Sequence, residues 1–298
     1  MPSLVLALNP SIDAEWRVDE VQWEEKNNVR SERRWAGGKG INVARWLKHL
    51  GSQPLLLLPL GDRTGAELAG HLRAETIPVK IIPLRQPTRV NVIITTNTGR
   101  QMRFNPPGPE ISAQDWGRLL ATAKRELARA DLLILSGSLP RGLPDNTYAV
   151  LLRLAHRFGV KTLLDCDGRA FAAALLERPF LVKPNEHELA QWWGRPLRAE
   201  AEIVRAARAL SKQTRGWVLV SRGDKRSLLL NEAEGSCSFA QPPRVKPLNT
   251  VGAGDALLAA VARAIQTGQP PATWLSAGVK TGSAAVRLVA GTLPGRSL

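Results

Sequence analysis

The sequence is short of several residue types and patterns, and each shortage excludes a class of protein. Only two of its 298 residues are cysteines, Cys166 and Cys237, which argues against a disulfide framework and is typical of the reducing cytoplasm. Apolar runs such as Leu132–Leu135 and Pro54–Leu60 are far shorter than the ~20 residues that cross a bilayer, so we expect no transmembrane helix. Residues 1–8 lack a basic region before their apolar stretch and are predicted to form a strand, not a signal peptide.

Acidic side chains are also in the minority. Lys and Arg number 41 against 26 Asp and Glu, which gives a net charge of +15 and an isoelectric point near 10.8. Such a charge attracts anions of any kind, including nucleic acid, acidic membranes and phosphorylated metabolites. The basic residues are dispersed, however, with no run longer than Arg33-Arg34, whereas a nucleic-acid-binding arm would show a cluster. We therefore expect neither a nucleic-acid nor a membrane partner.

The order of apolar segments predicts the fold class. No internal repeat, low-complexity tract or linker divides the chain, so a single continuous domain is favoured. Strand-like runs are predicted over residues 4–8, 54–60, 132–135, 161–164, 180–182 and 217–220. Helices are predicted over residues 40–49, 64–76, 112–129, 145–158, 199–213, 253–266 and 273–289. This alternation predicts a parallel α/β sheet covered by helices on both faces.

Two segments break the alternation. Residues 15–35 have no helical periodicity, and residues 89–103 alternate around a turn at Asn97-Thr98-Gly99. We interpret both as antiparallel strands of a small β-lid, formed by residues of about 14–35 and 88–105. Three tryptophans lie in the first segment, at positions 16, 23 and 35. They either cover the underside of the lid or form part of an oligomer interface, where tryptophan is enriched.

Two glycine-containing motifs open predicted helices. In Asn249–Ala256 the small residues Gly252, Ala253 and Gly254 let backbone N–H groups converge on one point, which makes an anion site. Asp255 in that turn is either a carboxylate favoured by the helix dipole or a base that deprotonates a hydroxyl beside a held phosphoryl group. The second motif, Ala36–Ala44, matches neither a P-loop nor a dinucleotide fingerprint and is by itself a weak signal.

Together these motifs resemble the two signatures of the PfkB (ribokinase-like) carbohydrate kinase family. Further segments in the family's order and spacing are 8–13, 88–92, 107–109, 136–140 and 183–189, so the resemblance covers essentially the whole chain. They look most like the hexose-phosphate branch: 1-phosphofructokinase, tagatose-6-phosphate kinase and the minor 6-phosphofructokinase. The resemblance implies one kinase domain over residues 1–298 with a mostly parallel central sheet, helices on both faces and the β-lid.

The resemblance also assigns roles to single residues. Asp255 matches the catalytic base, and Gly252, Ala253 and Gly254 match the anion hole for the transferring phosphoryl group. The sugar-binding positions that it implies are Asp13, Gly37, Gly38, Asn42 and Ser138. The ATP-binding positions that it implies are Lys183, Asn185, Ser221, Gly223, Gly254 and Gly282. Asn185 and Glu188 match a motif that helps to hold Mg²⁺ through water, although the same pair also fits a helix cap. Arg222 stands where the family usually has an apolar residue.

Basic residues near the acceptor site predict a substrate that already carries phosphate. Lys39 and Arg89 match positions of the hexose-phosphate branch, while Arg103 matches the minor 6-phosphofructokinase better than 1-phosphofructokinases. A hairpin around residues 97–99 is expected to bring Arg89 and Arg103 near each other across the strands. Two arginines there suit a phosphate dianion, although solvated lid charges are the alternative.

We therefore expect an ATP- and Mg²⁺-dependent cytoplasmic kinase that converts a ketohexose phosphate into a bisphosphate. A 1-phosphofructokinase is favoured over a 6-phosphofructokinase or a tagatose-6-phosphate kinase. Two other hypotheses are a neutral-sugar or nucleoside kinase of the same family, and a non-enzymatic basic binding protein on a kinase scaffold. A homodimer through the β-lid is typical of the family and is also expected here.

Overall fold

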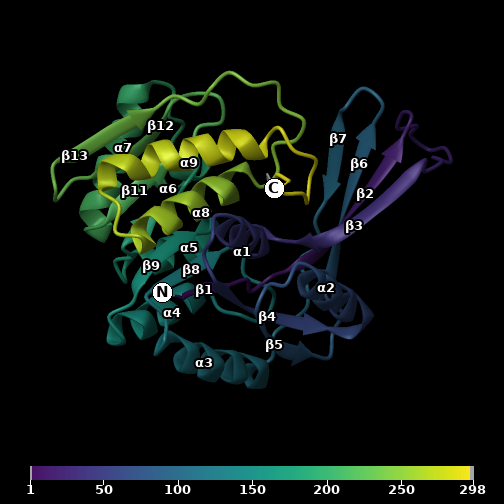
Figure 1. Ribbon diagram of the computed structural model, residues 1–298, viewed down its shortest axis with the longest axis horizontal. Coiled ribbons are helices and arrows are strands. Elements are labelled where there is room, and N and C mark those ends of the chain that lie inside the picture. Colours follow the sequence, from purple (N-terminus) through teal and green to yellow (C-terminus); the bar gives the residue numbers. More distant parts are fainter. Residues whose placement is uncertain (1, 296–298) are drawn as a thin grey trace.

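The apolar runs of the sequence assemble into a large sheet, and a second, smaller sheet stands at one end of it (Figure 1). This is a computed structural model, and it describes residues 2–295; residues 1 and 296–298, which the predicted domain includes, lie outside the described residues. Among the described residues, no helix has both the length and the apolar character needed to cross a membrane.

The large sheet of residues 2–295 has nine strands in the order β13-β12-β11-β10-β9-β8-β1-β4-β5. Their bounds are β1 Ser3–Leu6, β4 Pro54–Gly61, β5 Val79–Leu84, β8 Leu132–Ser136, β9 Lys161–Asp165, β10 Leu181–Val182, β11 Trp217–Val220, β12 Ser227–Asn231 and β13 Ser236–Ala240. Neighbours from β11 to β5 run parallel, while β12 and β13 add an antiparallel edge. The mostly parallel sheet predicted from the alternation is confirmed.

Helices cover both faces of this sheet, as expected for parallel strands that are buried on both sides. The helices are α1 Lys39–His49, α2 Asp62–Ala74, α3 Ala113–Leu127, α4 Thr147–Arg157, α5 Gly168–Leu175, α6 Glu186–Trp193, α7 Glu200–Thr214, α8 Ala253–Gln266 and α9 Pro271–Ala285. One apolar core lies under α1, α2, α8 and α9, and the other lies under α3 to α7. The two cores fill the space on either side of the strands.

Most predicted elements are present with ends shifted by a few residues, and the predicted α8 has the observed bounds. Ser112 caps α3 as predicted, in a capping box with Asp115. The predicted helix over 273–289 begins earlier and ends at Ala285. Helices α5 and α6 and strands β5, β12 and β13 were not predicted, because short segments carry too little periodicity to be assigned to a helix, a strand or a loop.

The second sheet, which we call the lid, has the strand order β3-β2-β6-β7. Its strands are β2 Ser11–Val18, β3 Ser31–Gly37, β6 Arg89–Thr96 and β7 Gln101–Phe104. The outer pairs are antiparallel, but β2 and β6 in the middle run parallel, because each follows a separate strand of the body. The lid projects from the body beside the start of α1, which directly follows β3 (Figure 1).

The order of the large sheet reverses at β1, which lies between β8 and β4. In open α/β sheets, ligands bind beyond the carboxyl ends of the strands at such a reversal. The chain leaves β1, β8 and β9 at that edge, and the lid strands β2 and β6 start beside it. The topology therefore places the functional site between this edge and the lid.

Candidate active site

A cavity of about 1910 Å³ opens between the lid and the carboxyl edge of the large sheet. Every site residue predicted from the sequence lines it, except Gly37. The volume exceeds the ~300–1,000 Å³ of an ordinary small-molecule pocket, so it has room for two substrates side by side. Its lining runs from Arg89 and Arg103 at the lid to Ser221 and Gly223 at the far end.

The start of α8 forms the middle of the cavity. Gly252 caps this helix with φ +81°, a conformation that favours glycine. The residues of the first turn, whose N–H groups have no partner within a helix, line the cavity. The Asp255 side chain is buried in the same turn, and its Oδ2 accepts a hydrogen bond of 2.8 Å from Asn42 Nδ2. Asn42, predicted to bind a sugar hydroxyl, thus also holds the candidate base.

The surroundings of Asp255 tune its protonation. Burial, followed by the nearby charge of Asp165, raises the pKa of Asp255 to about 6, and the Asn42 hydrogen bond opposes this rise. A carboxylate with a raised pKa is a stronger base than an exposed one, yet it remains mostly ionised at pH 7. Asp255 is therefore able to accept a proton from a bound hydroxyl group.

Asp13, on β2, is a second buried carboxylate on the lid side. Ser11 Oγ and Asn91 Nδ2 each donate to Asp13 Oδ1 at 2.8 Å, while burial raises the pKa of Asp13. A Cβ atom at Gly37 would lie 2.2 Å from Asp13 Cγ, so only glycine leaves room for this carboxyl group. Gly37 thus leaves space for the Asp13 carboxyl group and does not itself line the cavity.

Two lysines converge on Asp165 at the end of β9. Lys39 Nζ and Lys183 Nζ each lie 3.3 Å from Asp165 Oδ1. Burial opposes ionisation of Asp165, but the two ammonium groups outweigh it and hold its pKa below the usual value. The charge of Asp165, and then that of Glu188, raises the pKa of Lys39, so this lysine stays protonated. Lys39 thus lines the cavity with its ammonium group beside Asp165 and Glu188.

Asn185 and Glu188 form a capping box at the start of α6. The Asn185 side chain accepts from the Glu188 N–H, and Glu188 Oε2 accepts from the Asn185 N–H, both at 2.8 Å. The helix-cap interpretation is correct, but Glu188 is also only 10% exposed and its Oε1 lies 3.6 Å from Lys39 Nζ. One oxygen of Glu188 thus serves the helix and the other faces the lysine at the cavity.

The same region fits a hydrated Mg²⁺. Asp165 Oδ2 is buried and has no hydrogen-bond partner among the described residues, although it lines the cavity beside Glu188. Across residues 2–295, no three His, Cys, Asp or Glu side chains cluster into a protein-only metal site. Mg²⁺ keeps several waters and usually takes one or two carboxylates together with substrate phosphates, so Glu188 and Asp165 suit it.

Arg89 and Arg103 lie on the cavity-facing side of the lid, but not opposite each other. Arg103 on β7 pairs with Ile93 on β6 across the hairpin. Arg89 lies four residues before Ile93 on β6, which is about 13 Å along that strand. The prediction that they are cross-strand neighbours is wrong, because Arg89 lies nine residues before the centre of the turn at Thr98 and Arg103 only five residues after it. Arg89 donates to the carbonyls of Asn9 and Pro106, and its buried Nε has no partner within the described part of the chain.

The far end of the cavity is formed by backbone and small residues. Gly254 and Gly282 lie where α8 and α9 pack, and a Cβ at Gly282 would lie 3.1 Å from the Ala253 carbonyl. Ser221 and Gly223 begin the loop between β11 and β12, and Ser221 pairs with Asn185 through backbone. At the near end, the exposed Ser138 hydroxyl accepts a hydrogen bond of 3.1 Å from Asn9.

Sequence reasoning missed three residues of this site. Asp165 follows β9 at the carboxyl edge of the sheet, which is a signal that was present. Asn91, which orients Asp13, and the ion pairs of Arg222 involve partners far away in the sequence. Local patterns carry no information on such contacts.

Comparisons with known proteins agree on one family. The family described as "pfkB family carbohydrate kinase" matches residues 7–294. The chain is 34% identical to the 1-phosphofructokinase of Bacillus subtilis over 282 residues, which cover 94% of this chain and 90% of that protein. It is 31% identical to the ATP-dependent 6-phosphofructokinase isozyme 2 of Escherichia coli over 283 residues, with coverages of 94% and 91%.

The fold is similar to solved structures over the same range. The crystal structure of Escherichia coli phosphofructokinase-2 in complex with fructose-6-phosphate matches with a TM-score of 0.87 and 29% identity. The match covers 96% of this chain and 93% of that one. The lid is thus included in the similarity as well as the α/β body.

Proposed function

The chain belongs to the pfkB family of carbohydrate kinases, and we propose that it transfers the terminal phosphoryl group of ATP to a hydroxyl group of a ketohexose phosphate. The product is a ketohexose bisphosphate. The observation that carries the proposal is the position of Asp255, a buried base at the helix N-terminus in the middle of a two-substrate cavity. Fructose 1-phosphate is the favoured acceptor, because several curated relatives at about 34% identity are 1-phosphofructokinases.

The reaction is an in-line displacement on phosphorus. Asp255 accepts the proton of the acceptor hydroxyl, whose oxygen forms a bond to the γ-phosphorus. The bond from that phosphorus to the β–γ bridging oxygen breaks, and ADP leaves. Asn42 orients the carboxylate for this transfer through its 2.8 Å hydrogen bond. Phosphoryl transfer needs little covalent help from the protein, so the arrangement of charges supplies most of the catalysis.

Positive groups around the transferring phosphoryl group stabilise its charge. The N–H groups at the start of α8, at Gly252, Ala253 and Gly254, form the anion hole. Lys39 has a place among them, because its ammonium group lies with Asp165 and Glu188 and not beside Arg89. A Mg²⁺ ion held through water by Glu188 and Asp165, with Asn185 maintaining the helix start, would neutralise the phosphate oxygens of ATP.

The lid end of the cavity binds the acceptor. Asp13, placed by Ser11 and Asn91, accepts hydrogen bonds from sugar hydroxyl groups. Arg89 binds the phosphate that the substrate already carries, since its buried guanidinium group has a donor without a partner in the described chain. Arg103, on β7, lines the cavity farther along the lid and adds positive charge to the acceptor end. The segments of about 14–35 and 88–105 then close as a lid within one kinase domain, which excludes water and limits ATP hydrolysis.

We further propose that the protein is a homodimer through the lid. Trp23 in the β2–β3 connection is 75% exposed and Phe104 on β7 is 50% exposed, which is unfavourable unless another surface covers them. Trp35, in contrast, is buried against Ile93 and Ala290, so it belongs to the lid's own packing.

Light scattering on the wild type and on Trp23→Glu tests this proposal. The wild type should have twice the chain mass, and the variant should be at least partly monomeric. Leu176→Glu is the control, because Leu176 is 74% exposed on the body, away from the lid. A monomeric wild type would refute the dimer.

We place the reaction in the cytoplasm, where ATP is available. Cys166 and Cys237, both free thiols in the described chain, remain reduced there.

An ADP-release assay with Mg·ATP tests the activity. The acceptors are fructose 1-phosphate, fructose 6-phosphate, tagatose 6-phosphate, fructose, ribose and adenosine. We expect turnover on one phosphorylated ketohexose and a loss of at least about 100-fold in kcat for Asp255→Asn. Turnover only on an unphosphorylated acceptor would contradict the roles of Arg89 and Arg103.

A further inference from the structure

Residues 221–226, which we call the nucleotide loop, connect β11 to β12, and residues 221–224 line the far end of the cavity. Arg222 lies in this loop, and its side chain is only 7% exposed, unlike that of a solvated surface arginine. A buried guanidinium group is costly unless charged partners surround it. The sequence offers no local reason for a charge at this position, so its partners indicate its role.

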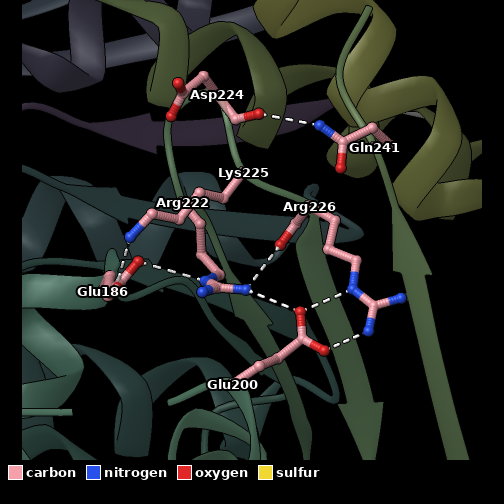
Figure 2. Close-up of polar contacts among 7 residues, drawn as sticks. All are labelled: Glu186, Glu200, Arg222, Asp224, Lys225, Arg226 and Gln241. Carbon is pink, nitrogen blue, oxygen red and sulfur yellow. Dashed lines mark hydrogen bonds and ion pairs between the residues drawn. The ribbon is translucent and has the colours of Figure 1, made fainter. Parts of the chain in front are cut away.

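Two glutamates from different helices hold Arg222 (Figure 2). Arg222 Nε donates to Glu186 Oε2 at 3.2 Å, and Nη1 donates to Glu200 Oε2 at 3.1 Å. Glu186 is the first residue of α6 and Glu200 is the first residue of α7. Arg222 Nη1 also donates to the carbonyl of Arg226 at 3.3 Å, which closes the loop on itself. One side chain thus joins the loop to the starts of two helices.

The rest of the loop strengthens the same attachment. Lys225 pairs with Glu186 at 3.4 Å, and Arg226 forms a two-contact ion pair with Glu200 (Figure 2). The Arg226 guanidinium also lies 4.4 Å from the centre of the Phe239 ring. On the opposite side, Gln241 Nε2 donates to the Asp224 carbonyl at 2.9 Å. These contacts hold the loop from several directions.

The contacts of the nucleotide loop also extend to the start of α6. Glu186 lies between Asn185 and Glu188, whose capping box starts α6. Its backbone N–H donates to the Ser221 carbonyl at 3.1 Å, so backbone and side chain of one residue both hold the loop. A shift of the loop would therefore move the helix start that carries Glu188.

We propose that Arg222 is a positioning residue for the nucleotide: its ion pairs with Glu186 and Glu200 hold the nucleotide loop in its binding shape before the nucleotide arrives. This inference rests on the proposed function, because it takes ATP as the ligand of this end. A loop that is already ordered avoids the entropy loss of ordering on binding. The benefit falls first on nucleotide affinity, since the direct contacts of Arg222 are with Glu186, Glu200 and the loop's own backbone and not with Asp255 or Asp13.

Arg222→Met tests the proposal, because methionine keeps much of the length and apolar bulk but removes the charge. We expect the Kd for Mg·ADP, measured by calorimetry, to rise roughly fivefold to tenfold, which is the effect of losing about one ordered side chain. KM for ATP should rise by a similar factor, while kcat and KM for the acceptor stay within about twofold. Arg222→Lys keeps one ion pair and should restore part of the affinity.

Hydrogen exchange separates positioning from a merely structural role. Backbone amides of residues 222–226 should exchange faster in ligand-free Arg222→Met, and saturating Mg·ADP should restore most of the protection. Arg153→Met is the matched control, since it removes an arginine–glutamate ion pair on α4, outside the cavity. It should leave Kd, KM and the loop's exchange unchanged.

Three results would overturn the proposal. One is an unchanged Kd for Mg·ADP in Arg222→Met together with a lower melting temperature, which would make Arg222 purely structural. Another is a fall in kcat without a change in nucleotide affinity. If Arg222→Met does not fold, Glu200→Gln takes its place and should raise the Kd for Mg·ADP roughly twofold to threefold. The third result that would overturn the proposal is an unchanged Kd in Glu200→Gln.

Failure of the proposed function gives a different result. A wild-type protein that binds Mg·ADP but phosphorylates none of the six acceptors refutes the acceptor assignment and leaves the calorimetry of Arg222→Met decisive. A wild-type protein that does not bind Mg·ADP at all refutes both.

Discussion

Asn42→Leu is expected to shift the acid limb of the pH–rate profile upward. Asn42 Nδ2 donates to Asp255 Oδ2 at 2.8 Å in a buried site, and this bond opposes the burial that raises the pKa of Asp255 to about 6. Leucine has nearly the same size as asparagine but donates no hydrogen bond. The ionised carboxylate would therefore lose its donor, while the protonated form would lose much less.

The size of the shift follows from the strength of that bond. A hydrogen bond to a charged group contributes about 1.5–3 kcal/mol, and one pKa unit corresponds to about 1.4 kcal/mol, so the pKa of Asp255 should rise by about 1–2 units. A base must be ionised to act, so activity is lost as the pH falls through its pKa. Losing the orienting bond lowers kcat/KM at all pH values, and between pH 9 and pH 6.5 the variant should lose roughly tenfold more in kcat/KM than the wild type does.

The assay is ADP release between pH 5 and 9 at constant ionic strength. The substrate's own phosphate also titrates near pH 6, so the informative quantity is the difference between the two profiles, in which substrate titration cancels. Ser138→Ala is the control, because Ser138 lines the same cavity but contacts Asn9 and not Asp255. Its acid limb should stay where it is in the wild type. An Asn42→Leu profile with an unmoved midpoint would refute Asp255 as the base or Asn42 as its partner.

Three further substitutions have effects that the structure predicts. Gly37→Ala places a methyl group 2.2 Å from Asp13 Cγ, so KM for the sugar phosphate should rise at least about tenfold with KM for ATP unchanged; steady-state kinetics showing equal effects on both would contradict this. Arg89→Met should raise KM for the phosphorylated acceptor at least about tenfold but leave any turnover of its unphosphorylated analogue unaffected, as competition kinetics would show. Ser112→Ala removes the cap that Ser112 shares with Asp115 and should lower the free energy of unfolding by about 1 kcal/mol in urea titrations without changing kcat; an unchanged midpoint would show that the cap does not contribute.

Local patterns in the sequence determined the helices and the motifs. The apolar spacing after Gly252 predicts α8 with its observed ends, and Ser112 predicts the start of α3, because helix caps and periodicity depend on residues within one or two turns. The same local signals place Asp255 in the first turn of a helix. The family resemblance then predicts site residues that, apart from Gly37, all line the cavity, since each motif is a short segment whose conformation its own residues set.

Only the tertiary structure decided which distant residues meet. Two lysines meet Asp165 because the carboxyl ends of β9 and β10 and the first residue of α1 all lie at one edge of the large sheet; the lysines are Lys39 and Lys183. The offset of Arg103 from Arg89 depends on hairpin register, which the turn sets and composition does not. Arg222 stands out in the sequence only as a departure from the family's usual apolar residue. Its ion pairs with glutamates on two helices exist only because the chain folds back on itself, and the energy of a buried charge depends on such neighbours.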